Sequence, residues 1–506
     1  MRQVSTLPKI VVEADGAPLS AETARTLAEV RIQQRLSLPT LCELTFFDPP
    51  DSLPVASALT PGSALRLMLQ GRPEHLFVGQ VTAVEYAYEP AHGRALRVRG
   101  YDLLHQLRKR QPVRGHVQVT FADLARELVA DLSISVHAPE PGPLWHRLIQ
   151  HQQSDLDLLT EVAERCGLYF TLRGDVLEVF TLEGIGEIVP LSLGESLLEA
   201  RIEVNGNPAC RSVSTAGWDP LRAEHHEGQA KIARVGRSVA VEVPPANVGG
   251  TGERTLVDEA TYDDNQAEAL AQAELDRRVA QEVTLWGVAE GDPRLRPGTS
   301  VEVRGVATSL AGRYPLTAVN HTIDSHKGFV SEISTAPPVP RPRARATIAA
   351  LGIVTRLGDP DGLGRVQVSL PTYGNVESGW MGVLTAGAGS GKGLVTLPDV
   401  GDHVLVLFPH GDPAQGVILG GLYGIQGPPD TGIEEGGVQR YTFLTPGGQR
   451  LRLDDARKAL RLENSEGSYV ELTPDKLLLH ARCDLAIEAP GRSVVIRGQS
   501  IDFERA

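Results

Sequence analysis

The sequence predicts a mainly β protein, built as a series of small β-barrels with a few helices and ending in a β-helix or β-prism. Apolar and polar residues alternate over many short runs, which is typical of half-buried antiparallel strands. Glycine (52) and proline (35) are frequent while aromatic residues make up only 5%, a composition that favours short strands and tight corners. At 506 residues the chain is too long to fold around a single hydrophobic core, so several domains are expected.

Residues 1–190 are predicted to form the first barrel domain, with helices. Strand-like runs between Lys9 and Glu85 are followed by two helical patterns, which begin near Phe121 and at Ser154. Ser154 is the expected N-cap of the second helix, because Asp157 stands at the third helical position and Gly167 stands where a C-cap glycine belongs.

Residues 191–335 repeat this pattern in kind and are predicted to form a second β-barrel domain. A helix is expected from Asp264 to Val279, with one apolar stripe. A linker rich in proline and arginine follows at 336–350. We expect it to be an extended, solvated spacer, the alternative being a basic segment that lies on an acidic neighbouring surface.

Residues 351–424 are predicted to form a small closed barrel of the OB type. Alternating strands at 352–357 and 365–370 flank a turn that contains Asp359, Pro360 and Gly362. Several further short strands with glycine corners follow, and closing a barrel removes the exposed edges of such a sheet. A linker rich in glycine and proline occupies 425–438.

The tail, residues 439–506, alternates strictly and is predicted to form a β-helix or prism. A single ladder of strands cannot bury its apolar face alone, so we expect three chains to wind together. The predicted interior positions of this trimer are Leu451, Leu453, Leu460, Leu462, Leu472, Leu477, Leu479, Ile487 and Val495.

Charge and cysteine usage exclude several classes of protein. The net charge of -14 argues against a nucleic-acid binder, which would carry a basic patch. The four cysteines (Cys42, Cys166, Cys210 and Cys483) have neither zinc-site nor disulfide-framework spacing. The sequence starts without a signal peptide and has no stretch of about 18 apolar residues, so we expect folding in the cytoplasm and only transient contact with a membrane.

Three motifs resemble chemical sites without meeting their requirements. The run from Gly387 to Gly393 lacks the first glycine and the hydroxyl of a phosphate-binding loop, since Ala386 and Gly393 occupy those positions. His225 and His226 are adjacent in a strand and would point to opposite faces. Asp359, Asp361 and Asp402 stand beside glycine or proline, where turns favour aspartate. We therefore predict no catalytic, cofactor-binding or metal-binding residues, and no enzyme.

Several spacings in the 351–424 region resemble a known family. The Asp-Pro-x-Gly-x-Gly-Arg-Val series from Asp359, the central Trp380, the Leu-Pro-x-Val-Gly-Asp series from Leu397, and Gly411-Asp412-Pro413 occur in this order. The region is similar to the OB domain of contractile-injection spike proteins, which include VgrG proteins, phage baseplate protein V and the hub and spike of T-even phage. In that family, paired hub barrels form a trimer with pseudo-sixfold symmetry.

The resemblance implies a structural hub-spike protein of a phage-tail-like contractile injection system. Such a trimer would sit at the centre of the baseplate, at the tip of the inner tube, and would puncture the target envelope when the sheath contracts. The implied partners are the inner tube protein, baseplate components and effector cargo, within a particle that is extracellular or secreted. A type VI secretion spike, a phage spike and an extracellular particle remain open, with the short tail favouring the latter two.

Two functions from other classes compete with this interpretation: an envelope-degrading, lysozyme-like spike enzyme and a trimeric carbohydrate-binding adhesin. At the end of the sequence, Ile501 and Phe503 would form a blunt apolar platform in a trimer. In the resembling machines a PAAR-type tip protein caps this end, so we expect such a partner to bind Ile501 and Phe503.

Overall fold

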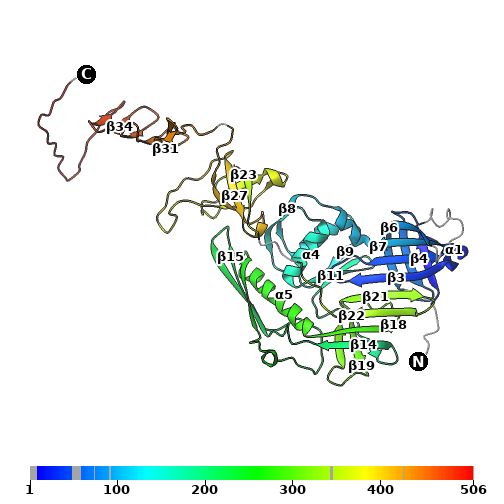
Figure 1. Ribbon diagram of the computed structural model, residues 1–506. Helices are drawn as coiled ribbons and strands as arrows, with labels where there is room; N and C mark the ends of the chain where they lie inside the picture. Colours follow the sequence, from blue (N-terminus) through cyan, green and yellow to red (C-terminus); the bar gives the residue numbers. More distant parts are fainter. Residues whose placement is uncertain are drawn as a thin grey trace. The chain divides into compact units, whose positions relative to one another are not determined.

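The computed structural model describes residues 8–47, 59–72, 74–89, 93–341, 346–425 and 427–504. The chain divides into two compact units, one ending at Leu422 and one beginning at Tyr423. In Figure 1 the first unit runs from blue to yellow and the second from orange to red.

An eleven-stranded sheet organises the first unit, in the order β14-β18-β22-β21-β3-β4-β7-β6-β5-β1-β2. Strand β3 pairs antiparallel with β21, so the two predicted barrel domains share this sheet instead of being separate. The strands are β1 (Ile10–Ala14), β2 (Ala17–Pro18), β3 (Leu27–Arg35), β4 (Leu41–Phe47), β5 (Ala64–Leu69), β6 (His75–Glu89), β7 (Gly93–Tyr101), β14 (Leu197–Val204), β18 (Val283–Glu290), β21 (Ala318–Asp324) and β22 (Gly328–Ser334).

Alternation along these strands produces one apolar face and one charged face. Ile32, Leu44 and Val98 point into the core, at 1% exposure or less. Their neighbours on the other face form cross-strand ion pairs, for example Arg99 with Glu43 at 3.3 Å. The predicted β-strand pattern of the N-terminal region is confirmed.

Two capped helices lie between β7 and β14. Helix α3 (Phe121–Val129) and helix α4 (Asp155–Cys166) each begin at a capping box, formed in α4 by Ser154 and Asp157. Helix α4 ends at Gly167, whose φ of 66° is the left-handed conformation that glycine adopts without strain. Both predicted caps of this helix are confirmed.

Short elements surround these helices and lead into the second half of the first unit. They are α1 (Ala21–Arg25), η1 (Leu103–Lys109), β8 (Arg114–Val119), β9 (Ser135–His137), β10 (Trp145–Gln150), β11 (Tyr169–Arg173), β12 (Val176–Phe180), β13 (Val189–Ser192), β15 (Ser212–Asp219), β16 (Glu224–Ala230), η2 (Pro245–Val248), β17 (Glu253–Ala260), β19 (Ser300–Arg304) and β20 (Gly312–Pro315).

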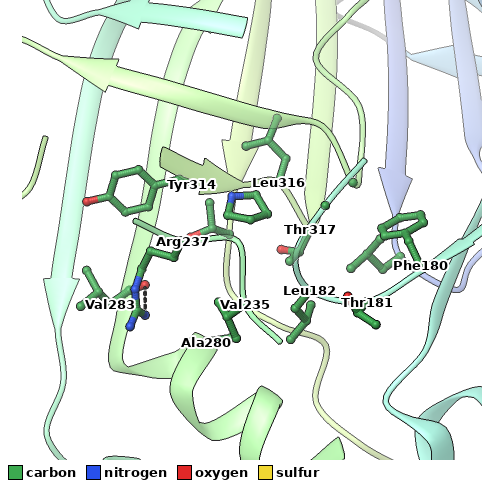
Figure 2. A pocket seen from close by; sticks show the side chains of 15 residues that line it. Phe180, Thr181, Leu182, Val235, Arg237, Ala280, Val283, Tyr314, Leu316 and Thr317 are labelled. Carbon is green, nitrogen blue, oxygen red and sulfur yellow. Dashed lines mark hydrogen bonds between the residues drawn. The ribbon is translucent and has the colours of Figure 1, made fainter. Parts of the chain in front are cut away.

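Helix α5 (Asp264–Glu282) packs on the sheet formed by β16, β15 and β17 (Figure 1). The predicted apolar stripe is buried, with Leu275 at 1% exposure. At its C-terminal end the Arg237 guanidinium donates to the carbonyl oxygens of Val279 (2.8 Å) and Val283 (3.2 Å). Figure 2 shows Arg237 beside Tyr314 and Val283, at a small apolar pocket lined by the end of this helix and by strand β20. The cation satisfies carbonyls that a helix end leaves unpaired.

Residues 348–421 form the predicted OB-type barrel, with a six-stranded sheet in the order β25-β24-β23-β27-β28-β26. Val366 and Met381 make an additional bridge, and their side chains are buried in its core with Val404, Val406 and Phe408. Its elements are β23 (Ile348–Arg356), β24 (Gln367–Leu370), η3 (Pro371–Tyr373), β25 (Val376–Glu377), β26 (Gly382–Val383), β27 (His403–Phe408), η4 (Pro409–Gly411) and β28 (Val417–Gly421).

The linker before this barrel is attached to helix α4. Arg341 donates to Asp157 at 2.6 Å, and its backbone N–H donates to Glu164 at 3.3 Å. Hydrogen bonds from Ser154 and from the Arg341 guanidinium lower the pKa of Asp157 against the opposing effect of its partial burial. The structure thus differs here from a fully solvated spacer, because an acidic helix supplies partners for the basic linker. Residues 342–345 of the predicted linker lie outside the described residues.

Candidate oligomerisation face of the C-terminal sheet

The second unit contains a five-stranded antiparallel meander. A small hairpin of β29 (Ile433–Glu434) and β30 (Gly437–Val438) precedes it. The strands of the meander are β31 (Arg440–Leu444), β32 (Arg450–Asp454), β33 (Ala459–Glu463), β34 (Tyr469–Leu472) and β35 (Leu477–His480). Each strand pairs with the next along the chain, so all five lie in sequence order. Because successive side chains point to opposite sides of a strand, the register decides what each face presents.

The register aligns apolar side chains into two rows that cross all five strands. One row consists of Phe443, Leu451, Leu462, Val470 and Leu479. The other consists of Tyr441, Leu453, Leu460, Leu472 and Leu477. We call these ten residues the apolar face. No polar side chain interrupts either row.

The apolar face is exposed, which reverses the usual arrangement of a one-sided sheet. Its leucines range from 37% exposure at Leu451 to 68% at Leu477. Within the described part of this unit no second layer covers them, and none of them belongs to a hydrophobic core cluster. Extended apolar surfaces of this kind mark protein–protein contacts, because a single-layer sheet needs a partner to be stable.

The opposite face is polar and its side chains cover one another. Arg461 lies 3.8 Å from the centre of the Tyr469 ring and donates to Glu463 at 2.8 Å and Glu471 at 3.5 Å. These carboxylates raise the pKa of Arg461. The charged side chains are therefore more covered than the leucines, and the polar face is the one suited to solvent.

A second cluster of charged side chains lies at the start of the meander. Arg440 pairs with Asp430 at 3.1 Å and also with Glu434, while Thr442 donates to Asp430 at 2.9 Å. The Arg440 guanidinium is the main reason that the pKa of Asp430 lies well below its usual range. This cluster ties the segment before the sheet to its first strand.

The structure brings most of the predicted trimer-core residues together. Seven of them, Leu451, Leu453, Leu460, Leu462, Leu472, Leu477 and Leu479, lie on the apolar face. Ile487 and Val495 lie farther along the chain, in residues 481–504, where the structure assigns no strand, although the predicted β-helix or prism included these residues. Tyr441, Phe443 and Val470 complete the face. Val470 follows from the same alternation, and extending that alternation by one strand toward the N-terminus would have found Tyr441 and Phe443.

The predicted tip residues lie in the same strandless segment. Ile501 is 49% exposed and Phe503 is 92% exposed. Their apolar side chains have no buried packing partner among the described residues of this unit. The structure therefore leaves them accessible and does not place them on the apolar face.

The OB barrel carries a buried ion pair at its first turn. Arg365 donates to both oxygens of Asp359, at 2.7 and 2.8 Å, and to Asp361 at 2.7 Å. Side-chain exposure is 7% for Arg365 and 2% for Asp359, and the guanidinium lowers the pKa of Asp359 strongly. Asp359 also accepts the backbone N–H groups of Asp361 and Leu363. Its predicted role in the turn is confirmed.

The other motifs occupy surface positions. Residues 387–393 form an exposed loop, closed by a bridge between Gly389 and Lys392. His226 contacts Asp264 at 3.1 Å, whereas His225 is exposed opposite Trp218 on the neighbouring strand. Asp402 accepts the backbone N–H of Asp399 at 2.8 Å, a turn contact. No group of three His, Cys, Asp or Glu side chains in the described ranges is placed to hold a metal ion.

Two family matches cover much of the chain. Residues 5–325, more than half of the sequence, match the Alg8 N-terminal domain. Residues 350–423 match the type VI secretion system/phage-baseplate injector OB domain. The second match coincides with the OB-type barrel and with the motifs singled out in the sequence.

A curated relative and two solved structures are similar to this chain. The type VI secretion system spike protein VgrG4b of Pseudomonas aeruginosa is 28% identical over 166 residues, which are 30% of this chain and 19% of that protein. The half-lidded PdpA-VgrG complex of Francisella has a TM-score of 0.56 at 8% identity, covering 95% of this chain and 89% of that one. The E. coli c3393 protein, a component of the type VI secretion system, has a TM-score of 0.52 at 14% identity, covering 82% and 100%.

Proposed function

Because this chain belongs to the Alg8 N-terminal domain family and to the wider family of VgrG and phage-baseplate spike proteins, we propose that it is the trimeric hub-spike of a contractile injection machine. The apolar face of the C-terminal sheet carries this proposal. An apolar face of ten side chains in register, nine of them exposed, requires a partner surface, and copies of the same chain supply one with matching strand spacing.

Three copies fit the proposal better than two. Two sheets packed face to face would also cover the leucines, but the resemblance to hub-spike proteins implies three chains. A threefold arrangement places the apolar rows around one axis and leaves the Arg461 face toward water. The resulting needle is narrow and densely hydrogen-bonded, which suits the transmission of a mechanical thrust.

The work of this spike is mechanical: it transmits the force of sheath contraction to the target envelope. The proteins it resembles are structural spike components, and we assign no catalytic step to the chain. Among the described residues no helix is long and apolar enough to cross a membrane. We propose that the chain folds in the cytoplasm, joins the inner tube and baseplate, and touches the target membrane only on firing.

Chemical crosslinking of the purified chain tests the proposed assembly. The ladder of crosslinked species should end at three copies. A ladder that ends at two copies would support a two-sheet sandwich and overturn the trimer. A zymogram with peptidoglycan should remain uncleared, and a cleared band would replace the mechanical role by the lysozyme-like alternative.

A PAAR-type protein is the proposed tip partner, held by Ile501 and Phe503. Their exposure supports an apolar contact, with Phe503 as the anchor. Phe503→Asp should abolish co-purification with the tip protein while the trimer persists. Tyr423→Asp is the matched control, because Tyr423 is also an exposed aromatic residue, at 73%, and lies outside the proposed contact. Retained binding by Phe503→Asp would place the contact elsewhere.

A further inference from the structure

A pocket of about 420 Å³ lies in the first unit, where several parts of the fold meet. Its walls come from β3, β6, β11, the start of β13 and the loop at 293–299. The pocket lies outside the OB barrel and the C-terminal sheet. Neither the family matches nor the proposed spike function assigns it a role.

Arg173 lines this pocket without a carboxylate partner among the described residues. Its Nη2 donates to the carbonyl oxygen of Pro297 at 3.0 Å and to the Thr299 hydroxyl at 3.3 Å. Its Nε is buried and has no hydrogen-bond partner in the described part of the chain. The guanidinium is thus held in place by neutral acceptors, with its charge uncompensated by any ion pair.

Arg296 lines the same pocket in the same condition. Its Nε donates to the carbonyl oxygen of Pro293 and its Nη2 to that of His75, each at 2.8 Å, and it has no ion pair within the described ranges. Burial lowers the pKa of Arg296 and that of Arg173, and the charge of Arg296 lowers the pKa of Arg173 further. Glu74 opposes the effect of burial on Arg296 by raising its pKa. Two half-buried guanidinium groups without an ion pair, lining one pocket, would be stabilised by an anion.

Arg294, a third arginine of the pocket, shows the usual arrangement for comparison. Its Nη2 donates to Oδ2 of Asp292 at 2.6 Å and its Nε donates to Oδ1 at 3.2 Å, so its charge is already compensated. It is also exposed, whereas Arg173 and Arg296 are half-buried. Arg294 therefore offers a matched control within the same pocket.

Gln34 adds a second requirement. Its side chain lines the pocket and is only 9% exposed, yet its Oε1 is buried without a hydrogen-bond partner among the described residues. A buried amide oxygen needs a donor. The ligand that completes the pocket must therefore bring both an anionic acceptor and an N–H or O–H donor.

The remaining walls narrow the class of ligand. Phe77, Leu172 and Ile188 give the pocket an apolar side. Three carboxyl groups also line it: Glu74 and Glu187 are exposed, and Asp102 is buried, which raises its pKa to about 6. These carboxylates disfavour a multiply charged phosphate more than a singly charged carboxylate that carries an apolar group.

We propose that this pocket binds the C-terminal carboxylate of a peptide chain from a partner protein, with an apolar last residue. Arg173 and Arg296 hold the carboxylate, for which the planar guanidinium fork is well matched. The last peptide N–H donates to Gln34, and the last side chain lies against Phe77 and Leu172. Recognition of a chain end by such convergent donors is a known mode of peptide binding.

Calorimetry with the purified full chain and two peptides tests the proposal. The probes are N-acetyl-Gly-Ala-Leu as the free acid and as the C-terminal amide, at pH 7. The acid should bind, and the amide should bind at least about tenfold more weakly. Arg173→Gln and Arg296→Gln should each weaken binding of the acid by about tenfold or more, whereas Arg294→Gln should change it less than about threefold.

Three results would overturn the assignment. They are equal affinity for acid and amide, absence of binding of the acid at about 10 mM peptide, and unchanged affinity in both Arg173→Gln and Arg296→Gln. Inorganic phosphate that competes more strongly than the free acid would indicate a general anion site instead of a chain-end site. The comparison of acid with amide uses the unaltered protein, so it stands even where a variant folds poorly.

Discussion

Replacing Leu462 by aspartate should prevent assembly of the chain. Leu462 lies in the middle strand of the apolar face, opposite Leu451 on one side and Val470 on the other. It is 55% exposed in the single chain, so about half of its burial remains to be gained on assembly. Complete burial of a leucine side chain is worth about 1.5–3 kcal/mol, which leaves about 0.8–1.7 kcal/mol per chain and about 2.5–5 kcal/mol per trimer.

The aspartate adds a larger penalty than the lost burial. Three carboxylates would be brought together in an apolar column, where each costs several kcal/mol of desolvation and lacks a cation. The combined loss exceeds about 5 kcal/mol per trimer, which lowers the association constant by more than about a thousandfold. Size-exclusion chromatography with light scattering should find the Leu462→Asp chain as a monomer at micromolar concentration.

Leu478→Asp is the matched control, because Leu478 is on the opposite face, paired with Glu471. The new carboxylate would face water, and its repulsion by Glu471 costs only about 0.2–1 kcal/mol. This variant should assemble like the parent. If both variants assemble, or if Leu478→Asp alone fails, the assigned direction of the apolar face is wrong.

Three further predictions concern the tail, the OB barrel and strand β21 of the first unit. Removing the residues after Gly437 should leave the first unit soluble, and the isolated tail should lack cooperative β structure by circular dichroism when dilute; a stable monomeric fold would contradict this. Asp359→Asn should destabilise the OB barrel by about 3 kcal/mol in denaturant unfolding, against less than about 1 kcal/mol for the exposed Asp361→Asn. Because the pKa of Asp359 is lowered in the fold, its contribution to the free energy of unfolding is present above about pH 4 and is lost below. Equal losses of stability in the two variants would refute the role of the buried Asp359–Arg365 ion pair. His321 is buried, and burial lowers its pKa to about 4. As the pH falls from 6.5 to 4, the free energy of unfolding should therefore decrease by about 1.4 kcal/mol per pH unit, because the unfolded chain binds a proton that the folded chain does not. The fall should be absent in His321→Gln, and an unchanged pH profile would contradict the assignment.

Local signals in the sequence were sufficient for elements that depend on neighbouring residues. Ser154, Asp157 and Gly167 define helix α4 because capping and left-handed glycine act within one or two turns. The turn at Asp359 and the alternation of the tail leucines are equally local. These features therefore predicted the helix, the OB hairpin and most of the apolar face.

Long-range pairing was beyond the reach of these signals. Strand β3 pairs with β21, which begins almost three hundred residues later, and no local pattern specifies which distant strand completes a sheet. The contact of Arg341 with Asp157 also depends on tertiary placement. The pocket at Arg173 and Arg296 could not be predicted for the same reason, since its walls come from segments far apart in the sequence.

The mass of the full-length chain in solution tests the central claim most directly. Sedimentation equilibrium at micromolar concentration should give three times the 54.4 kDa mass of one chain, since only assembly covers the apolar face. A stable species of 54.4 kDa would show that the face tolerates water, and it would contradict the spike assembly proposed for this protein.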